Sequence, residues 1–319
     1  MTIPASAVTV TDDTGTTVAA DATPVKIISL APSNTEILAS LDLLNNTVGI
    51  TDACDYPPEV KKIPRVGGDA FISIERVAAA QPDLILASDI TPKATVQRLR
   101  DLGLTVIVLA PRNLSQVIEA IRLVGSVTGS ENRAQAIAES MAAHINNNSS
   151  DTPSINRPTI AHILWHEPIM VSGNNTLQND VIVHAGGSNA FGDQAGWYTT
   201  SLETLLAKNP DIIIVNDIGN DQTTSLINVL LTSPKFSSLS AVKRHHVYAV
   251  DPDIISRPGP RIVEGLEQVR EVINNFKETA PLSSSVQSPK TPPQCSEIPG
   301  FVFLIGFVYY GFWSLRRMH

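Results

Sequence analysis

The fold is decided by two stretches that repeat one another, IERVAAAQPDLIL at residues 74–86 and LETLLAKNPDIII at residues 202–214. In each, a glutamate opens a short helix, Pro-Asp turns the chain, and an apolar strand follows. A strand–helix unit that recurs far along the chain indicates two α/β lobes of similar design.

Outward from these stretches, short apolar strands alternate with helical patterns, which predicts parallel sheets covered by helices. Between the two halves, residues 113–148 carry a long helical pattern with an interruption at Thr128-Gly129-Ser130, which either kinks or splits the helix. We therefore expect an α/β fold of two lobes with mainly parallel sheets, joined by a single long backbone helix.

The expected segments follow from these patterns. They are an N-terminal extension and hairpin (1–24), an N-terminal α/β lobe (25–112), the linking helix (113–148), a C-terminal α/β lobe (149–277), a Ser/Thr/Pro-rich spacer (278–297) and a hydrophobic tail (298–319).

Composition excludes several classes of function. A net charge of -8 without a basic cluster in the body argues against a nucleic-acid partner. Nucleotide-binding glycine loops and the Gly-x-Ser-x-Gly elbow are missing from the sequence, and no nucleophile has a neighbouring base. We therefore expect a protein that is not an enzyme and has no cofactor.

Glu75 and Glu203 occupy equivalent places in the two repeats. A glutamate in the first turn of a helix is favoured by the helix dipole alone, by a few tenths to about 1 kcal/mol. Equivalent positions in two similar lobes, however, would place one carboxylate at the tip of each. Such a pair suits docking onto two basic pockets of a partner.

Several motifs resemble a known family. They are IISLAPSNTE at 27–36, TDACDYPPE at 51–59, IPRVGG at 63–68, GGSNAF at 186–191 and the segment around Glu203. Together they are similar to the binding proteins that serve ATP-driven importers of vitamin B12, ferric siderophores and haem. The resemblance covers residues 8 to 277 and implies that Glu75 and Glu203 engage arginines of the permease subunits.

Loops at the carboxyl ends of the strands are the usual ligand side of an α/β sheet. The candidate ligand-binding residues on these loops are Ser33, Asn34, Asp52, Tyr56, Gly68, Phe71 and Asp89 in the first lobe, and Trp165, His166, Glu167, Trp197, Asp217 and Arg257 in the second. Four of them are aromatic in a chain with only 5% aromatic residues.

Charge favours one class of ligand over the others. The cleft loops carry many acids but only Arg65, Lys93 and Arg257 as cations, whereas a buried polyanionic siderophore would need an arginine cluster. Aromatic walls suit a large corrinoid, so we expect cobalamin as the transported ligand. A ferric siderophore or haem is the alternative, and a metal-dependent or sensory protein that reuses the fold is a more distant one.

Histidines do not form a metal motif. His162 and His166 are four residues apart but lie in an expected strand without the intervening glutamate of zinc proteases. We expect no metal site, and His166 alone as a residue that could face the ligand.

The C-terminal tail predicts the location. An apolar run from Ile298 to Leu315 followed by Arg316-Arg317 is long enough to span a membrane with its basic end inside. Pro299, Gly300 and Phe301 resemble the sorting signal of archaeal surface proteins, whose tail is replaced by a lipid. Both interpretations place the body, a monomer, on the extracellular face, although MTIPASAVTV at the N-terminus lacks the features of a signal peptide.

Overall fold

The N-terminal lobe is built on a sheet of four short apolar strands. In the computed structural model, which describes residues 7–21, 23–68, 71–146, 157–217 and 225–279, they are β3 (Ile27–Ser29), β4 (Thr47–Ile50), β7 (Leu84–Ser88) and β8 (Val106–Leu109). All are parallel, in the order β4-β3-β7-β8. Nearly every residue of these strands is buried, as expected of a sheet covered on both faces.

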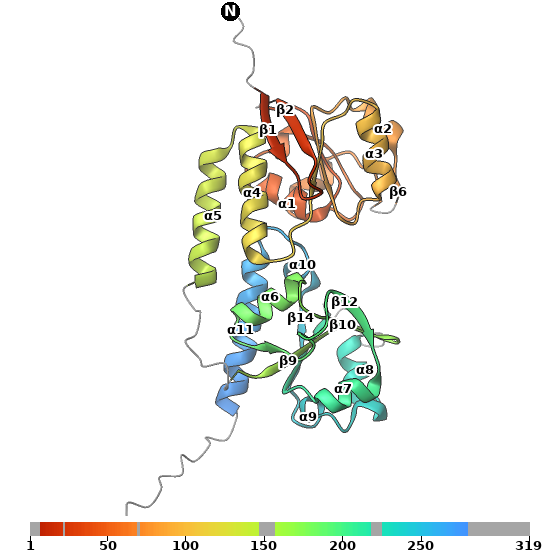
Figure 1. The fold of residues 1–319 in the computed structure, drawn as a ribbon, viewed down its shortest axis with the longest axis vertical. Coiled ribbons are helices and arrows are strands. Elements are labelled where there is room, and N and C mark those ends of the chain that lie inside the picture. The colour runs from red at the N-terminus through yellow and green to blue at the C-terminus, as the bar shows by residue number, and fades with distance from the viewer. Residues whose placement is uncertain (1–6, 22, 69–70, 147–156, 218–224, 280–319) are drawn as a thin grey trace, which may run out of the picture. The chain divides into compact units, whose positions relative to one another are not determined.

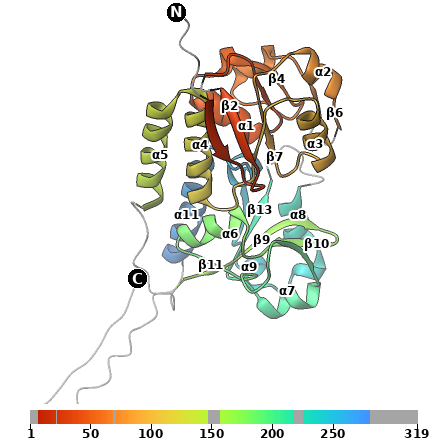
Figure 2. The same cartoon turned by 45° about the horizontal axis from the view of Figure 1, so that its top comes forward.

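Helices cover the two faces of this sheet (Figures 1 and 2). The helices α2 (Ile74–Ala79) and α3 (Lys93–Asp101) pack on the face that carries Ile85, while α1 (Pro32–Ser40) packs on the face that carries Leu84 and Leu86. Single turns of 3-10 helix at Leu44–Asn46 and Pro58–Lys62 complete the connections. The alternation along β7 therefore divides the lobe into two apolar layers.

Two hairpins lie beside the sheet. The strands β1 (Ala7–Thr11) and β2 (Thr17–Asp21) pair antiparallel around a turn. Asp12 in that turn is buried, pairs with Arg100 at 2.7 Å and accepts a hydrogen bond from the N–H of Val108 at 3.2 Å. The first hairpin is thereby fastened to the edge strand β8. A smaller hairpin joins β5 (Gly67–Gly68) to β6 (Phe71–Ile72).

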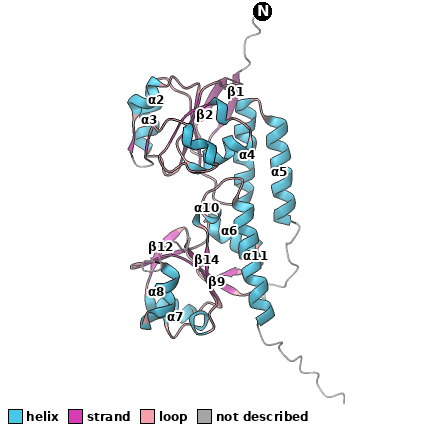
Figure 3. Ribbon diagram, turned by 180° about the vertical axis from the view of Figure 1, so that it is seen from behind, coloured by secondary structure: helices cyan, strands magenta, loops and turns pink. Residues whose placement is uncertain are grey.

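The described part of the linking segment, residues 113–146, forms two helices, so the interruption at residues 128–130 splits the expected helix. They are α4 (Leu114–Thr128) and α5 (Glu131–Asn146), and they pack side by side (Figures 1 and 3). Gly129 ends α4 in the left-handed region at φ 66°, which reverses the chain. A Cβ at Gly125 would lie 2.3 Å from the Ala134 Cβ, so this glycine permits the close approach of the two helices.

The C-terminal lobe has a mixed sheet, less uniformly parallel than expected. Its strands are β9 (Thr159–His166), β10 (Ile169–Ser172), β11 (Ser188–Asn189), β12 (Trp197–Thr200), β13 (Ile212–Asn216) and β14 (Val247–Val250). The strands β9, β13 and β14 are parallel, whereas β10 is antiparallel to both β9 and β12. The antiparallel part arises because β9 and β10 form a hairpin around Glu167-Pro168.

Helices also cover the second sheet. They are α6 (Leu177–His184), α7 (Leu202–Lys208), α8 (Leu226–Thr232), α9 (Ser240–Lys243), α10 (Pro252–Ile255) and α11 (Ile262–Thr279), with a 3-10 turn at Pro234–Phe236. Residues of α7, α8 and α9 pack with Ile213 and Val215 on one face, whereas α6 and α11 pack with Ile212 and Ile214 on the other.

One apolar cluster runs through both lobes. It contains Leu84 and Leu86 of the first sheet, Ile212 and Ile214 of the second, and buried residues of α4, α5 and α11 between them. These three helices form the common support of the lobes, in place of a single long helix. The two-lobed α/β architecture itself is as predicted.

The repeated stretches form the same structure in each lobe. Gln81 and Asn209 both have positive φ, at 49° and 39°, before the Pro-Asp pair. Asp83 then accepts hydrogen bonds from the N–H groups of Val25 and Lys26 at 2.8 Å, immediately before β3. Asp211 accepts the equivalent bond from Thr159 at 2.8 Å, at the start of β9. The motif thus joins each central strand to its neighbour.

The spacer and tail predicted at 278–319, including Pro299, Gly300 and Phe301, lie almost wholly outside the described residues. All of the described residues belong to the compact unit Met1–Ala280. Within the described ranges, no helix is both long and apolar enough to cross a membrane.

Candidate functional site

A cavity lies between loops of the two lobes, and we call it the central cavity. Its volume is about 280 Å³. The N-terminal lobe contributes residues just after β7 and β8, and the C-terminal lobe contributes the start of α6, the start of β12 and the loop after α10. The lining residues are Asp89, Ile90, Pro111, Arg112, Asn175, Thr176, Leu177, Gln178, Gly196, Trp197, Ser256 and Pro258. Loops that leave the carboxyl ends of parallel strands therefore form its first wall.

Two further cavities adjoin the central one. The hairpin cavity, of about 450 Å³, lies beside the β1–β2 turn and the start of α3 and shares Asp89 and Arg112 with the central cavity. The helix cavity, of about 350 Å³, lies at the starts of α4 and α6 and shares Arg112, Asn175 and Thr176. The adjoining volumes give the site room for a ligand larger than the central cavity alone.

The four predicted aromatic residues are all exposed, but of the four only Trp197 lines one of the three cavities. Tyr56 is 41% exposed, Phe71 86%, Trp165 52% and Trp197 41%. Trp197 lines the central cavity, and Trp165 stacks against His166 with ring centroids 5.3 Å apart. Exposed aromatic rings of this size offer a broad apolar face to an incoming ligand.

A buried hydrogen-bonded chain supports the wall that carries Trp197. His162 is fully buried in β9, and its ring meets the Trp197 ring edge-on at 5.6 Å. Its Nε2 lies 2.9 Å from Asn216 Oδ1, and Asn216 donates to Ser256 Oγ at 3.1 Å. Gln178 also donates to Ser256, at 3.3 Å. Burial lowers the pKa of His162 to about 4, so the ring is neutral at physiological pH.

An ionic cluster joins the two lobes beside the site. Glu36 of α1, with only 2% of its side chain exposed, accepts two hydrogen bonds from Arg261, at 2.6 and 3.0 Å. Arg257 pairs with Glu36 at 3.3 Å, with Asp55 at 2.7 Å and with Asp253 at 2.8 Å. The hydrogen bond from Arg257 lowers the pKa of Asp55. Both arginines are thus neutralised by acids of the protein.

Tyr56 belongs to the same cluster. The Arg261 guanidinium lies 3.8 Å from the centroid of its ring, which is a cation–π contact. One face of this aromatic ring is therefore already occupied, and the edge and the other face remain for a ligand.

The other predicted residues have varied positions. Ser33 and Asn34 are buried in the first turn of α1, and the Asn34 amide donates to the Ala87 carbonyl at 2.9 Å. Asn34 as a wall residue is therefore wrong, because its side chain serves the interior of the lobe. Arg257 is a cross-lobe ion-pair residue instead of an open cation.

Asp89 lines the central cavity, while Glu167 is exposed 3.6 Å from Lys235. Asp217 accepts hydrogen bonds from Ser225 and from the N–H of Ile227, at the start of α8. Asp52 and Gly68 lie together, since the N–H of Asp52 donates to the Gly67 carbonyl at 2.9 Å.

Sequence reasoning missed several lining residues, among them Arg112, Asn175, Gln178 and Ser256. Arg112 follows β8 as Asp89 follows β7, so the rule of carboxyl strand ends could have found it. Asn175 and Gln178 lie at the start of a helix in the other lobe, and only the folded chain brings them to the same cavity.

The docking candidates have matching surroundings. Glu75 and Glu203 lie in the first turns of α2 and α7, each after a serine that caps the helix, Ser73 or Ser201. Both carboxylates are exposed, and hydrogen bonds from their own backbone N–H groups and the capping serines lower their pKa values. Both are thus ionised and open to a partner.

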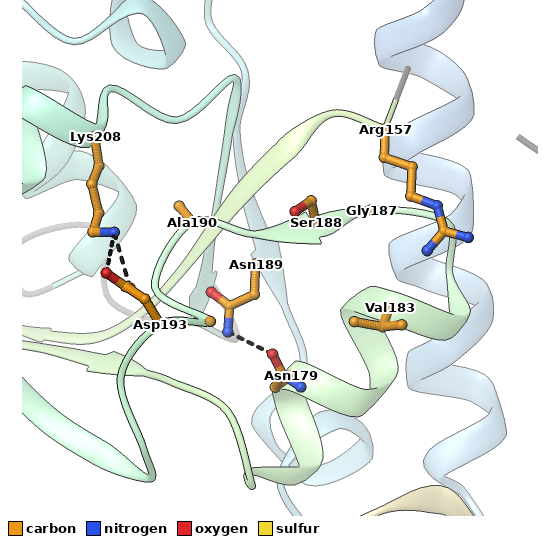
Figure 4. A pocket seen from close by; sticks show the side chains of 10 residues that line it. Arg157, Asn179, Val183, Gly187, Ser188, Asn189, Ala190, Asp193 and Lys208 are labelled. Atoms are coloured by element: carbon orange, nitrogen blue, oxygen red, sulfur yellow. Dashed lines mark hydrogen bonds and ion pairs between the residues drawn. The ribbon is translucent and has the colours of Figure 1, made fainter. Parts of the chain in front are cut away.

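A further cavity of about 500 Å³, the rear cavity, lies beside β11 and α6 and contains none of the predicted residues (Figure 4). Its polar groups are largely paired with one another: Lys208 binds Asp193 at 3.0 Å, and Asn189 donates to Asn179 at 3.0 Å. Across the described residues, no group of three or more His, Cys, Asp or Glu side chains is placed to hold a metal ion.

The fold and the inter-lobe cavity define a two-lobed α/β binding protein. Residues 27–254 match the periplasmic binding protein family. The chain is 32% identical over 281 residues to YvrC of Bacillus subtilis, an uncharacterized ABC transporter substrate-binding lipoprotein, covering 85% of this chain and 87% of that protein. The chain belongs to the periplasmic binding protein family, and it is a substrate-binding protein rather than an enzyme.

Other relatives carry ligand names. The vitamin B12-binding protein of Vibrio cholerae is 27% identical over 246 residues, which cover 76% of this chain and 87% of that protein. This chain is also similar to the crystal structure of the Vibrio cholerae vitamin B12-binding protein. The TM-score is 0.70 at 25% identity, and the match covers 80% of this chain and 98% of that chain. The haem-binding protein of Roseiflexus sp. has the same TM-score and identity over 79% and 98%.

Proposed function

We propose that this chain is the solute-binding subunit of an ABC importer and that it binds a corrinoid, cobalamin, at the central cavity. The Bacillus subtilis relative is named as an ABC transporter substrate-binding protein, and the Vibrio cholerae relative as a vitamin B12-binding protein. Similar structures carry the names of other ligands as well, among them haem, Fe3+-hydroxamate and molybdate, so the choice rests on the residues of the site.

The observation that carries the proposal is the set of exposed aromatic rings, two from each lobe. Tyr56 and Phe71 come from the first lobe, and Trp165 and Trp197 come from the second. A broad, rigid, largely apolar ring system gains contact area with each of them. A corrinoid exceeds the central cavity, so it would extend over the adjoining cavities and the exposed rings of Phe71 and Trp165.

Charge supports a corrinoid against a polyanionic siderophore. Arg257 and Arg261 are held by Glu36, Asp55 and Asp253. Arg65 donates to the Thr51 and Cys54 carbonyls, both at 2.7 Å. Freeing these cations for an anionic ligand would leave buried or half-buried acids without partners, which is costly.

Equilibrium dialysis against cyanocobalamin tests the ligand, with haem and a ferric hydroxamate siderophore in parallel. We expect retention of cyanocobalamin, followed by its visible absorbance, and weaker retention of the other two. Truncating both tryptophans, Trp165→Ala with Trp197→Ala, should weaken binding by about 10-fold or more, since each buried aromatic contact contributes on the order of 1 kcal/mol. Absence of retention at tens of micromolar cyanocobalamin refutes the proposed ligand.

We also propose that Glu75 and Glu203 are the points at which the protein docks on the permease. The matching serine-capped helices place an ionised, exposed carboxylate on each lobe. Arginine on the partner would bind such carboxylates with paired hydrogen bonds.

The location follows from the same role. We propose that the body, a monomer, lies on the extracellular face of the cell membrane, held by residues 298–319 or by a lipid that replaces them at Pro299-Gly300-Phe301. The lipoprotein name of the Bacillus subtilis relative supports a membrane-attached protein. Membrane fractionation of cells that express the chain with and without residues 298–319 tests this, and an unchanged distribution argues against the anchor.

A further inference from the structure

Arg112 lies where the three cavities of the site meet. It is the one residue, of those the structure describes, that lines the central, hairpin and helix cavities together. The chain places it between β8 and α4, two elements of the N-terminal lobe. Its own N–H donates to Gln116 Oε1 at 2.8 Å, which fixes the backbone from which the guanidinium extends.

The Arg112 guanidinium has no ion-pair partner within the described residues, unlike the other arginines of the site. Arg257 and Arg261 are neutralised in the ionic cluster, and Arg100 is paired with Asp12 at 2.7 Å. Asp89 shares two cavities with Arg112 but forms no ion pair with it. Arg112 is therefore an open cation at the centre of the site.

Polar residues near Arg112 form their hydrogen bonds with other groups and do not neutralise its charge. Asp180, which lines the helix cavity, accepts a hydrogen bond from the N–H of Leu114 at 2.8 Å and lies 3.5 Å from His184. Asn113 uses its side-chain oxygen to cap α4 through the N–H of Gln116 at 2.8 Å. Asp180 and Asn113 are thus engaged elsewhere and Asp89 forms no ion pair with Arg112, so the guanidinium is left to bind a group from outside the protein.

We infer that Arg112 binds a single anionic group on a side arm of the ligand, and that for a corrinoid this group is the phosphodiester of the nucleotide arm. The inference rests on the proposed function. A guanidinium binds phosphate oxygens with two parallel hydrogen bonds. One open cation matches one anion, whereas a ligand with several anionic groups would leave the others unpaired. Arg112 is thus a specificity-determining residue for the arm, while the aromatic residues contact the ring.

Comparison of two corrinoids tests the inference. Cobinamide keeps the corrin ring but lacks the phosphodiester and the nucleotide. We expect Arg112→Gln to weaken cyanocobalamin binding by about 10-fold, as for the loss of a charged hydrogen bond, and to weaken dicyanocobinamide binding by less than about threefold. Arg112→Lys should recover part of the loss, and added salt should weaken cyanocobalamin binding more for the wild-type protein than for Arg112→Gln.

Arg98→Gln is the matched control, because Arg98 is exposed on α3 and lines none of the three cavities. It should leave both affinities unchanged. An equal loss for both corrinoids, or no loss for cyanocobalamin in Arg112→Gln, overturns the inference while the proposed function stands. A wild-type protein that binds neither corrinoid overturns both.

Discussion

At the scale of single residues, the site depends on neutral polar groups buried behind the aromatic wall. His162 is the clearest example, because it is fully buried, it contacts Trp197 and it has one hydrogen bond, to Asn216. Burial of an imidazole without a carboxylate partner disfavours its charged form. The wall that holds Trp197 is therefore sensitive to acid.

A pH dependence follows from His162. Its pKa is lowered from 6.5 in the unfolded chain to about 4 in the folded protein. As the pH falls, the unfolded state binds the proton first. The contribution of neutral His162 to the free energy of unfolding is therefore complete above about pH 6.5 and is lost as the pH falls toward 4. The free energy of unfolding should fall by up to about 3 kcal/mol more in the wild-type protein than in His162→Gln between about pH 7 and pH 4.

Urea unfolding at several pH values measures this difference. His245→Asn is the control, since His245 is exposed in a left-handed conformation that asparagine tolerates. Its pH profile should run parallel to that of the wild-type protein. A His162→Gln profile that also runs parallel would show that His162 does not titrate as described.

Prediction from sequence could single out residues that are rare or repeated. The tryptophans stood out in a chain with few aromatic residues, and Trp197 does line the cavity. It failed where tertiary contacts decide: Asn34 turns inward to the Ala87 carbonyl, and Arg257 is held by acids from both lobes. Arg112 follows the carboxyl end of β8, which could have marked it as a candidate, but only the folded chain shows that it lines all three cavities.

At the scale of elements, the repeated motif determines how a short helix connects to a central strand in each lobe. A serine cap, a short helix, a residue with positive φ and a Pro-Asp pair recur in both lobes, and the aspartate joins two strands in each. These local signals could be read from the sequence because they act within a few residues. The interruption between α4 and α5 was visible in the sequence, but the choice between a kink and a split depends on Gly129 and on the contact of Gly125 with Ala134.

A prediction for transport concerns Glu75 and Glu203 in the exposed first turns of α2 and α7. Changing Glu75 and Glu203 together to alanine should leave corrinoid affinity intact and cut uptake at least about 10-fold in cells that carry the importer, since paired arginines would lose their carboxylates. Reversing both charges to arginine should be more severe. The measurement is uptake of radiolabelled cyanocobalamin beside dialysis of the same purified variants.

The matched control replaces two other exposed glutamates, Glu119 of α4 and Glu271 of α11, with alanine. The net charge changes equally, but neither residue lies on α2 or α7. Full uptake by the Glu75 and Glu203 double variant, or an equal loss in the control, would contradict docking at these positions.

At the scale of the whole molecule, the two lobes share one apolar cluster and one ionic cluster. The first runs through α4, α5 and α11, and the second joins Glu36 of α1 to Arg257 and Arg261 of the other lobe. Burying Glu36 without its two arginines would cost several kcal/mol. The lobes are thereby held in one arrangement, and the cavity between them is largely formed before a ligand arrives, which lowers the entropic cost of binding.

The most direct measurement of the central claim is the tryptophan emission of the protein, truncated after residue 279 to remove Trp313, during titration with cyanocobalamin. The remaining tryptophans are Trp197, which lines the central cavity, and Trp165, which is exposed on β9, and a corrinoid absorbs where tryptophan emits. We predict quenching that saturates at one corrinoid per protein. Emission that falls no more than that of free tryptophan at equal cyanocobalamin would contradict a corrinoid bound at these aromatic walls.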